Sequence, residues 1–502
     1  MLVWLRLERL RLHAADAALF ALLVALTLAL YVASCPSVPG AWDTGEMQSV
    51  PYVLGVSHPT GFPLYTLIGY VFSHVFAIGT VAFRLNVLGS VSMSCAIGLL
   101  FTVMRALGIP RFLAAPAALW AGLTHIVWLH GARSEVHDLA FALLLGVLLA
   151  AVVFVRTGSR SALLWGAAAY AAAVATHSIA VLAAPALLVA LVLRRKNIEL
   201  RTLAAAALVA ASGALLYLYM PLRSAYVVAR GLDPTIGLQG LNGALITNYG
   251  DTRVPENFVR YVTGADFSAG NTLATVLDAA AWQNHLWALF QWVDQSFGAY
   301  AIVAAALGAA AVARANWRLA LVVTLFCFAV VPFIDAYTLE GDPDRYRFLP
   351  YAGVAIALGA SGGRVLGAGS PAWRQIVVEL FLAGSCVAQF LTGRGMIGSS
   401  DGGPHDLIVW TAKAVPPGAL LVTRWLDATP LGYGALVDGE FKGRIVVAGW
   451  WDDYAKDYCQ WSARYPVYIM IDGVPNAGFK KIRRRDASHT VYRFDPARGC
   501  VR

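Results

Sequence analysis

Eleven long apolar segments dominate this chain of 502 residues and limit the folds that are open to it. A helix needs about 20 predominantly apolar residues to cross a bilayer. Only 13% of the residues are charged, whereas soluble proteins carry roughly a quarter. We therefore predict an α-helical polytopic membrane protein with about 11 transmembrane helices. The segments are residues 15–34, 85–104, 112–130, 138–155, 161–177, 178–193, 202–221, 297–313, 319–335, 346–363 and 375–392.

Two further apolar features affect the count of spans. Residues 15–34 form a run too long for an ordinary cleaved signal peptide, so we interpret them as an uncleaved first helix. Residues 65–79 are apolar but short, and Gly69, His74 and Gly79 interrupt them. We predict a half-buried or surface-lying helix there, with a full span as the alternative.

The distribution of Lys and Arg predicts the orientation of the spans. With a cytoplasmic N-terminus, the loops on that side hold 15 basic residues, and the short loops on the other side hold only Arg84, Arg133, Arg345 and Arg347. Because positive charge favours the cytoplasmic side, the net charge of +9 belongs there and does not indicate nucleic acid as a partner. The 15 residues are Arg6, Arg9, Arg11, Arg105, Arg111, Arg156, Arg160, Arg194, Arg195, Lys196, Arg201, Arg314, Arg318, Arg364 and Arg374.

The composition changes at about Gly395 to that of a soluble domain. We predict a transmembrane domain over residues 1–394, with external loops 35–84 and 222–296, and an extracytoplasmic α/β domain over residues 395–502. Within the second domain, residues 419–422, 444–447 and 467–471 are typical of strands. The basic run 480–485 is interpreted as a solvated turn or strand edge, with attraction to lipid headgroups as the alternative.

The six cysteines contain no CxxC pair, so no zinc or redox motif is indicated. Cys459 and Cys500 share the hydrophilic domain and could form a disulfide if that domain faces an oxidising compartment.

A polar motif follows the first apolar segment and contains Asp43, Glu46 and His58. The two acids stand three residues apart, so on a helix they project to the same side. They could simply cap or solvate a loop at the membrane surface. Alternatively, one is a general base and the other positions it or shifts its pKa.

Other polar residues are predicted on the same, non-cytoplasmic face. Arg133, Glu135, His137 and His177 lie where spans emerge, either as ordinary polar helix ends or as substrate-binding residues. Arginine forks match phosphate oxygens, so an arginine could bind the phosphate of a membrane-borne substrate. The candidates are Arg345 and Arg347, with Arg223 as a weaker one, and self-pairing within an acidic-basic loop is the alternative for the first two. No cofactor is indicated with certainty. Asp43, Glu46 and Glu135 could supply oxygen ligands to a divalent cation, but no spacing in the sequence fixes the geometry of such a site.

Several of these residues lie in motifs that resemble a known family. The family comprises GT-C class polytopic glycosyltransferases and includes the human transmembrane protein O-mannosyltransferase and its bacterial relatives. Its second motif has an aromatic residue such as tyrosine where this chain has His137. The resemblance covers roughly residues 15–265. It rests on Asp43–Glu46, residues 54–65, Arg84–Asn86, residues 128–139, His177, residues 217–223, residues 248–251 and residues 257–264.

The resemblance implies a glycosyltransferase that takes a hexose, such as mannose, from a polyprenyl-phosphate donor. The sugar would pass to an acceptor hydroxyl on the extracytoplasmic face with inversion, Asp43 acting as base and Glu46 supporting it. The implied partners are the lipid-linked donor, an acceptor protein or glycan and the bilayer. The expected location is the bacterial inner membrane. A transporter or flippase is the main alternative and a non-catalytic scaffold is a third. Charges at helix ends, rather than in mid-span, favour the enzyme.

Overall fold

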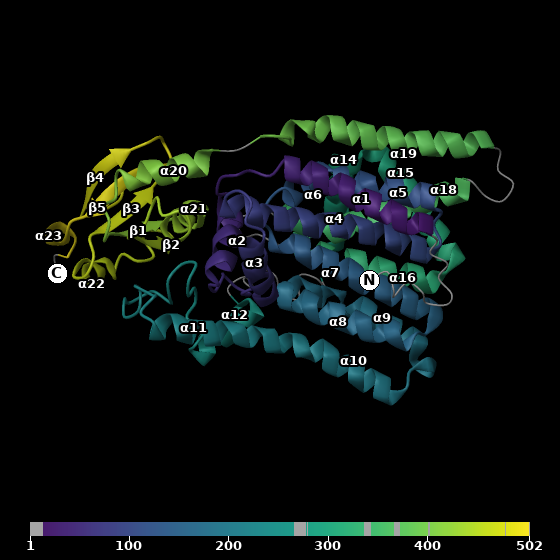
Figure 1. Cartoon of the computed structure of the whole chain (residues 1–502), viewed down its shortest axis with the longest axis horizontal. Coiled ribbons are helices and arrows are strands. Elements are labelled where there is room, and N and C mark those ends of the chain that lie inside the picture. Colours follow the sequence, from purple (N-terminus) through teal and green to yellow (C-terminus); the bar gives the residue numbers. More distant parts are fainter. Residues whose placement is uncertain are drawn as a thin grey trace.

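The computed structural model describes residues 14–265, 278, 280–335, 343–365, 372–399, 402–476 and 478–500. A bundle of long helices forms one part of the molecule, and a small sheet domain lies at one end of it (Figure 1). The two short helices α2 (Trp42–Val53) and α3 (Pro63–Val75) lie at the junction between these parts. The N-terminal polar motif therefore occupies the boundary between bundle and sheet domain.

Each of the eleven predicted segments coincides with a helix or with consecutive helices. Among the described residues, six helices are long and apolar enough to cross a membrane, or up to eight if each of two bent pairs counts as one span. The chain is thus a multi-pass membrane protein, and the number eleven stays a prediction. The helices are α1 (Ala14–Ala33), α4 (Val81–Leu107), α5 (Arg111–Leu123), α6 (His125–Gly131), α7 (Val136–Thr157), α8 (Arg160–Thr176), η2 (Ser178–Ala183), α9 (Ala184–Arg194), η3 (Arg195–Asn197), α10 (Leu200–Ser212), η4 (Gly213–Leu218), α11 (Tyr219–Ala229), α15 (Ala299–Ala315), α16 (Trp317–Phe328), α17 (Val331–Asp335), η6 (Pro343–Arg347), α18 (Phe348–Val365), α19 (Ala372–Gly393) and η7 (Arg394–Met396).

Helix α3 confirms the short helix predicted over residues 65–79. Its 13 residues make a helix about 20 Å long, which is shorter than the hydrocarbon core of a bilayer. Tyr65, Thr66 and Gly69 are buried, whereas Tyr70 and Val71 are exposed. This length favours the short helix over the alternative of a full span.

The predicted cytoplasmic loops meet at one end of the bundle. Arg105 pairs with Asp16 at 2.8 Å, and Arg156 donates a hydrogen bond to the carbonyl oxygen of Ala106. Arg194 in turn donates to the carbonyl oxygens of Val155 and Arg156, each at 2.6 Å. These contacts place the ends of α1, α4, α7 and α9 together, as the alternation of charge along the sequence predicted.

The long polar segment between α11 and α15 begins later than expected. The sequence predicted an external loop over 222–296, but the apolar helical run continues from Leu200 to Ala229. Pro221 does not end it, because this residue lies in the first turn of α11, where a proline is tolerated. The segment also contains α12 (Pro255–Thr263) and α14 (Trp282–Phe297), and α14 is bent by 113° from α15.

The sheet domain contains a five-stranded mixed sheet. Its order is β2-β1-β3-β5-β4, with parallel pairs β2–β1 and β1–β3 and antiparallel pairs β3–β5 and β5–β4. The sequence predicted β1, β2 and β3 but not β5. The bounds are β1 (Leu420–Thr423), β2 (Ile445–Ala448), β3 (Val467–Ile471), β4 (Phe479–Arg484) and β5 (Thr490–Phe494), with helices α20 (Gly403–Ala412), α21 (Trp425–Leu436), α22 (Tyr458–Ser462) and α23 (Pro496–Gly499).

The basic run 480–485 lies mainly on β4, an edge strand with mostly exposed residues. This confirms the predicted strand edge. In Figure 1, β4 lies on the side of the sheet domain that faces away from the bundle. The alternative, attraction of this run to lipid headgroups, stays a prediction.

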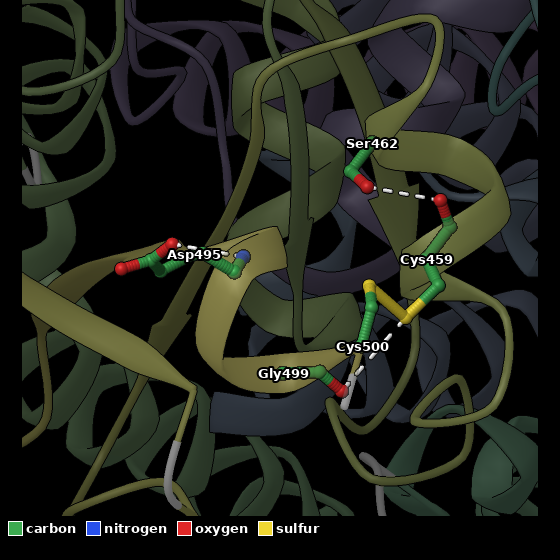
Figure 2. Close-up of a disulfide and its surroundings, with 6 residues drawn as sticks. Cys459, Ser462, Asp495, Gly499 and Cys500 are labelled. Atoms are coloured by element: carbon green, nitrogen blue, oxygen red, sulfur yellow. Dashed lines mark hydrogen bonds between the residues drawn. A yellow bond between two sulfur atoms is a disulfide. The ribbon is translucent and has the colours of Figure 1, made fainter. Parts of the chain in front are cut away.

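A disulfide closes the C-terminal part of the sheet domain. Cys459 of α22 is bonded to Cys500, which follows α23, and their Cα atoms are 5.7 Å apart (Figure 2). The bond joins residues 41 positions apart. The pairing that the sequence allowed is thus present, as expected of a domain that faces an oxidising compartment.

Candidate active site

A cavity of about 1350 Å³ lies between the end of the helical bundle and the sheet domain. Its walls combine segments that lie far apart in the sequence. They include the Asp43–Glu46 motif, residues 132–137 and two tryptophans of the sheet domain, Trp425 and Trp450. Residues predicted on one face of the membrane therefore do surround one space. The residues with polar or aromatic side chains include Trp42, Asp43, Thr44, Gln48, His58, Phe62, Asn86, Arg133, Glu135, His137, His177, Tyr249, Arg260, Arg345, Tyr346, Trp425 and Trp450.

Asp43 lies in the first turn of α2, on the wall of this cavity. One carboxylate oxygen, Oδ2, is 2.7 Å from the guanidinium of Arg345. The other, Oδ1, accepts a hydrogen bond of 2.8 Å from the indole N–H of Trp425. The side chain is 15% exposed, so the carboxylate is held on both oxygens and still borders the cavity.

The surroundings of Asp43 keep it ionised. Burial by itself would raise the pKa of Asp43, but the positive charges of Arg345 and His58 and the hydrogen bonds from Trp425 and Arg345 together outweigh this effect. The pKa of Asp43 is consequently held well below its ordinary value. The cavity thus has a fixed negative charge beside a fixed guanidinium.

Glu46 lies one turn further along α2 but in a different environment. Its side chain is fully buried and is not among the residues that line the cavity. It accepts a hydrogen bond of 2.7 Å from the backbone N–H of His58 and forms an ion pair with the Nδ1 atom of the same residue. Burial raises the pKa of Glu46, although His58 opposes that effect. Glu46 therefore holds the 58–62 segment in place rather than facing the cavity.

Glu135 supplies a second carboxylate to Arg345. Its Oε2 atom is 3.5 Å from the Arg345 guanidinium, and its Oε1 atom accepts a 3.0 Å hydrogen bond from the hydroxyl of Thr44. Arg133 approaches the same carboxylate, with 3.4 Å between Nε and Oε1. Arg345 thus lies between Asp43 and Glu135, and the Asp43–Glu46 motif is tied to the second motif.

Asn86 explains why the Arg84–Asn86 motif belongs to this site. The side chain is fully buried, and its carbonyl oxygen accepts hydrogen bonds of 2.8 Å from the Gln48 side chain and from the Ser134 backbone. Its amide donates to the carbonyl oxygen of Pro36 at 2.9 Å. One asparagine on α4 therefore fixes α2, the preceding loop and the start of α7 relative to one another.

Two histidines and two aromatic rings form another wall of the cavity. The centroids of His137 and His177 are 4.4 Å apart, and His177 stacks on Phe62 at 5.2 Å. Tyr346 contacts His137 edge-on at 4.9 Å. Within the described residues, neither ring nitrogen of His137 has a hydrogen-bond partner, although the side chain is only 5% exposed. The wall thus offers polar ring atoms within an aromatic surface.

Two of the predicted arginines lie elsewhere. Arg347 pairs with Asp344 at 2.7 Å and lies over the ring of Trp292. Arg223 donates to the carbonyl oxygen of Val53 at 3.0 Å. Neither is among the described residues that line the cavity. Of the three candidates for phosphate binding, the structure brings Arg345 alone to the cavity.

Three side chains of the site offer donor atoms to a metal ion. The ligand atoms of Asp43, Glu46 and His58 all lie within 4.8 Å of one another, and Glu135 is not part of this group. Carboxylate oxygens and an imidazole nitrogen suit several divalent cations. These donors already pair with Arg345, Trp425 and each other.

The sequence did not indicate the contribution of the sheet domain to the cavity. Trp425 and Trp450 line it, and Trp425 contacts Asp43 directly. The spacing of Trp425, Thr429 and Tyr433, four residues apart, was the available signal, because such residues share one face of a helix. Nothing in that spacing identified Asp43, 382 positions earlier, as the partner.

Parts of this chain resemble proteins that are already known. Residues 43–200 match the family model described as the Protein O-mannosyl-transferase TMEM260 N-terminal domain. A 73-residue stretch, 14% of this chain and 10% of the relative, is 42% identical to Protein O-mannosyl-transferase TMEM260 of Mus musculus. A 77-residue stretch, 15% of this chain and 9% of the relative, is 38% identical to Protein O-mannosyl-transferase tmem260 of Dictyostelium discoideum. The matches thus span about a tenth of these relatives.

The fold of nearly the whole chain resembles that of a solved structure. The crystal structure of ArnT from Cupriavidus metallidurans bound to undecaprenyl phosphate superposes with a TM-score of 0.54 and 14% sequence identity. The match covers 94% of this chain and 97% of that one. At this identity the likeness concerns the fold alone. The chain therefore has the GT-C fold seen in ArnT, and its residues 43–200 match the N-terminal domain of the TMEM260 protein O-mannosyl-transferases.

Proposed function

We propose that this protein transfers a hexose, such as mannose, from a polyprenyl-phosphate carrier to an acceptor hydroxyl. The observation that carries the proposal is the Asp43–Arg345 pair on the wall of a large cavity at one end of a multi-pass bundle. A carboxylate suits the acceptor hydroxyl and a guanidinium suits a phosphate. The match of residues 43–200 and the ArnT-like fold support the same reaction class.

In the proposed step, the acceptor oxygen attacks the anomeric carbon of the donor sugar. The new bond to the acceptor oxygen forms as the bond to the phosphate oxygen breaks, so the phosphate leaves with the electron pair and the sugar inverts. The acceptor proton passes to the Asp43 carboxylate. Since the pKa of Asp43 is low, the carboxylate is a weak base towards a resting alcohol. It therefore orients the hydroxyl first and takes the proton late, when the attacking oxygen has become acidic.

Arg345 and the histidine wall have separate roles in this proposal. Arg345 faces the leaving phosphate, and its two carboxylate partners hold it in position before the substrate arrives. Such preorganised charge stabilises the transition state without reorganisation during the reaction. His137 offers ring nitrogens, and His177 and Phe62 offer ring surface, to the hydroxyls and faces of the sugar.

We propose that the cavity faces the extracytoplasmic side of a bacterial inner membrane and that the N-terminus is cytoplasmic. The basic residues gathered at the opposite end of the bundle support this orientation. The disulfide of the sheet domain supports it independently, because such bonds persist in oxidising compartments. The ArnT structure is bound to undecaprenyl phosphate, and a lipid carrier of that class would reach the cavity from the membrane.

The direct test uses membranes that contain the protein and a radiolabelled polyprenyl-phosphate hexose. Label that passes from the lipid fraction to protein or glycan measures transfer. We expect Asp43→Asn to lower transfer by about 1,000-fold, within the range for loss of a general base. Asp453→Asn, an exposed acid of the sheet domain, is the matched control and keeps full transfer. Full transfer by Asp43→Asn would contradict the role assigned to Asp43. Mass spectrometry of cells with and without the gene identifies the acceptor.

A further inference from the structure

Helix α21 of the sheet domain packs against the helix that carries Asp43. Its residues Trp425, Thr429 and Tyr433 follow one another at intervals of four and thus share one face. The hydroxyl of Thr429 donates to the carbonyl oxygen of Trp42 at 2.5 Å, and the hydroxyl of Tyr433 accepts from the backbone N–H of Ala82 at 3.2 Å. These contacts fix the helix on α2 and on the start of α4.

The approach of α21 to α2 leaves little room for a side chain at Gly45. A Cβ atom added to Gly45 would lie 3.0 Å from the Thr429 hydroxyl and 3.1 Å from the backbone nitrogen of Pro430. It would also lie 2.5 Å from the carbonyl oxygen of Gly40. Gly45, between Asp43 and Glu46, therefore allows α21 to pack closely against α2. The Asp43–Glu46 motif is thus part of the contact between the bundle and the sheet domain.

Trp425 is the residue of α21 that reaches the reacting end of the cavity. Its indole N–H donates to Oδ1 of Asp43, while Arg345 holds Oδ2. The ring also meets His58 edge-on at 5.4 Å and Tyr249 at 5.7 Å. The tryptophan is therefore braced on two sides. With Arg345 as its sole partner, the carboxylate could still rotate about its contact at Oδ2. The hydrogen bond from Trp425 to Oδ1 fixes that rotation.

We propose that the sheet domain completes the active site and that Trp425 is a positioning residue for Asp43. The proposal rests on the proposed function, in which Asp43 orients the acceptor hydroxyl and takes its proton. Transfer then depends on α21 being seated on α2, so the soluble domain sets the geometry of a carboxylate that belongs to the membrane domain. Because Trp425 acts on Asp43 in this proposal and not on the donor, we expect donor binding to change little.

The test compares Trp425→Phe, which removes the indole N–H, with Trp425→His, which keeps a ring N–H donor. A hydrogen bond to a charged group is worth enough to change a rate by about 10- to 100-fold. We expect Trp425→Phe to lower kcat by about 30-fold and to leave KM for the lipid-linked donor within about 2-fold. Trp425→His recovers part of the lost kcat. Trp410→Phe, in α20 of the same domain and away from the cavity, is the matched control and keeps normal kcat.

The double variant Asp43→Asn/Trp425→Phe separates positioning from a general structural role. If Trp425 acts through Asp43, the double variant is no slower than Asp43→Asn alone. Normal kcat for Trp425→Phe overturns the inference, as does a further 30-fold loss in the double variant. Equal losses for Trp425→Phe and Trp425→His overturn it too, since they show that ring shape matters rather than the donor. Full transfer by Asp43→Asn overturns the proposed function itself, so the two failures are distinguishable.

Discussion

Asp43 and Glu46 lie three residues apart on the same helix, yet they occupy opposite environments. Asp43 borders the cavity, pairs with Arg345 and has a lowered pKa. Glu46 is fully buried, pairs with His58 and has a raised pKa. The comparison shows that their spacing places both acids on one helical turn. The partner of each acid and its depth of burial then determine whether its pKa is lowered or raised. One carboxylate borders the cavity and the other holds the loop that follows.

We expect the largest loss of activity when Arg345, the ion-pair partner of Asp43, is replaced. Arg345→Gln removes the main group that lowers the pKa of Asp43 and also the guanidinium that we assign to the leaving phosphate. We expect transfer to fall by about 1,000-fold, as for loss of a preorganised charge in an active site. Radiolabel transfer in membranes measures the effect. The neighbouring variant Arg347→Gln is the control and stays within about 3-fold of the wild type. Equal losses in both variants would show that the loop, and not the cavity arginine, is what matters.

Replacing Glu46 tests the other half of the comparison through stability. Glu46→Gln leaves His58 without its buried carboxylate, and breaking such a pair costs about 3 kcal/mol. We therefore expect a Tm several degrees lower in detergent, with kcat reduced by less than about 10-fold at temperatures well below unfolding. Asp43→Asn should show the reverse balance, a loss of kcat far larger than its effect on Tm, because Arg345 keeps Glu135 as a partner. If Glu46→Gln proves as inactive as Asp43→Asn at normal stability, Glu46 takes part in the reaction.

The Glu46–His58 pair also predicts how stability depends on pH. Burial by itself would lower the pKa of His58, but Glu46 and Asp43 outweigh this effect and raise it. Below about pH 6.5 the histidine is protonated in the folded and the unfolded chain, so its contribution to stability is fully present. That contribution is lost as the pH rises through the higher pKa of the folded state. We expect Tm to fall in the wild type as the pH rises above about 6.5. A flatter Tm profile in Glu46→Gln assigns the dependence to this pair, whereas an unchanged slope excludes it.

The sequence predicted the parts of this protein that depend on local composition. Apolar segments located the helices, and the alternation of Arg105, Arg156 and Arg194 with polar loops placed their ends correctly. Contacts between distant segments were not predictable in the same way. Arg345 and Arg347 look equivalent in sequence, but one lies between Asp43 and Glu135 and the other beside Trp292. Trp425 was missed because its partner lies on another domain, and no periodicity within one segment indicates which distant helix it meets.

The smallest expected effect concerns metal ions and follows from the same pairing of charges. The donor atoms of Asp43, Glu46 and His58 lie close enough together to hold a cation. Yet Arg345 already neutralises Asp43, and His58 pairs with Glu46, so a divalent cation would have to displace a guanidinium and break a buried pair. Breaking either pair would leave a buried charge without its partner, which costs free energy.

We therefore expect EDTA to change transfer by less than about 2-fold. Loss of transfer with EDTA, restored by Mn²⁺ or Mg²⁺, would show that a cation and not Arg345 holds the leaving phosphate. In that case Arg345→Gln should lose much less than 1,000-fold.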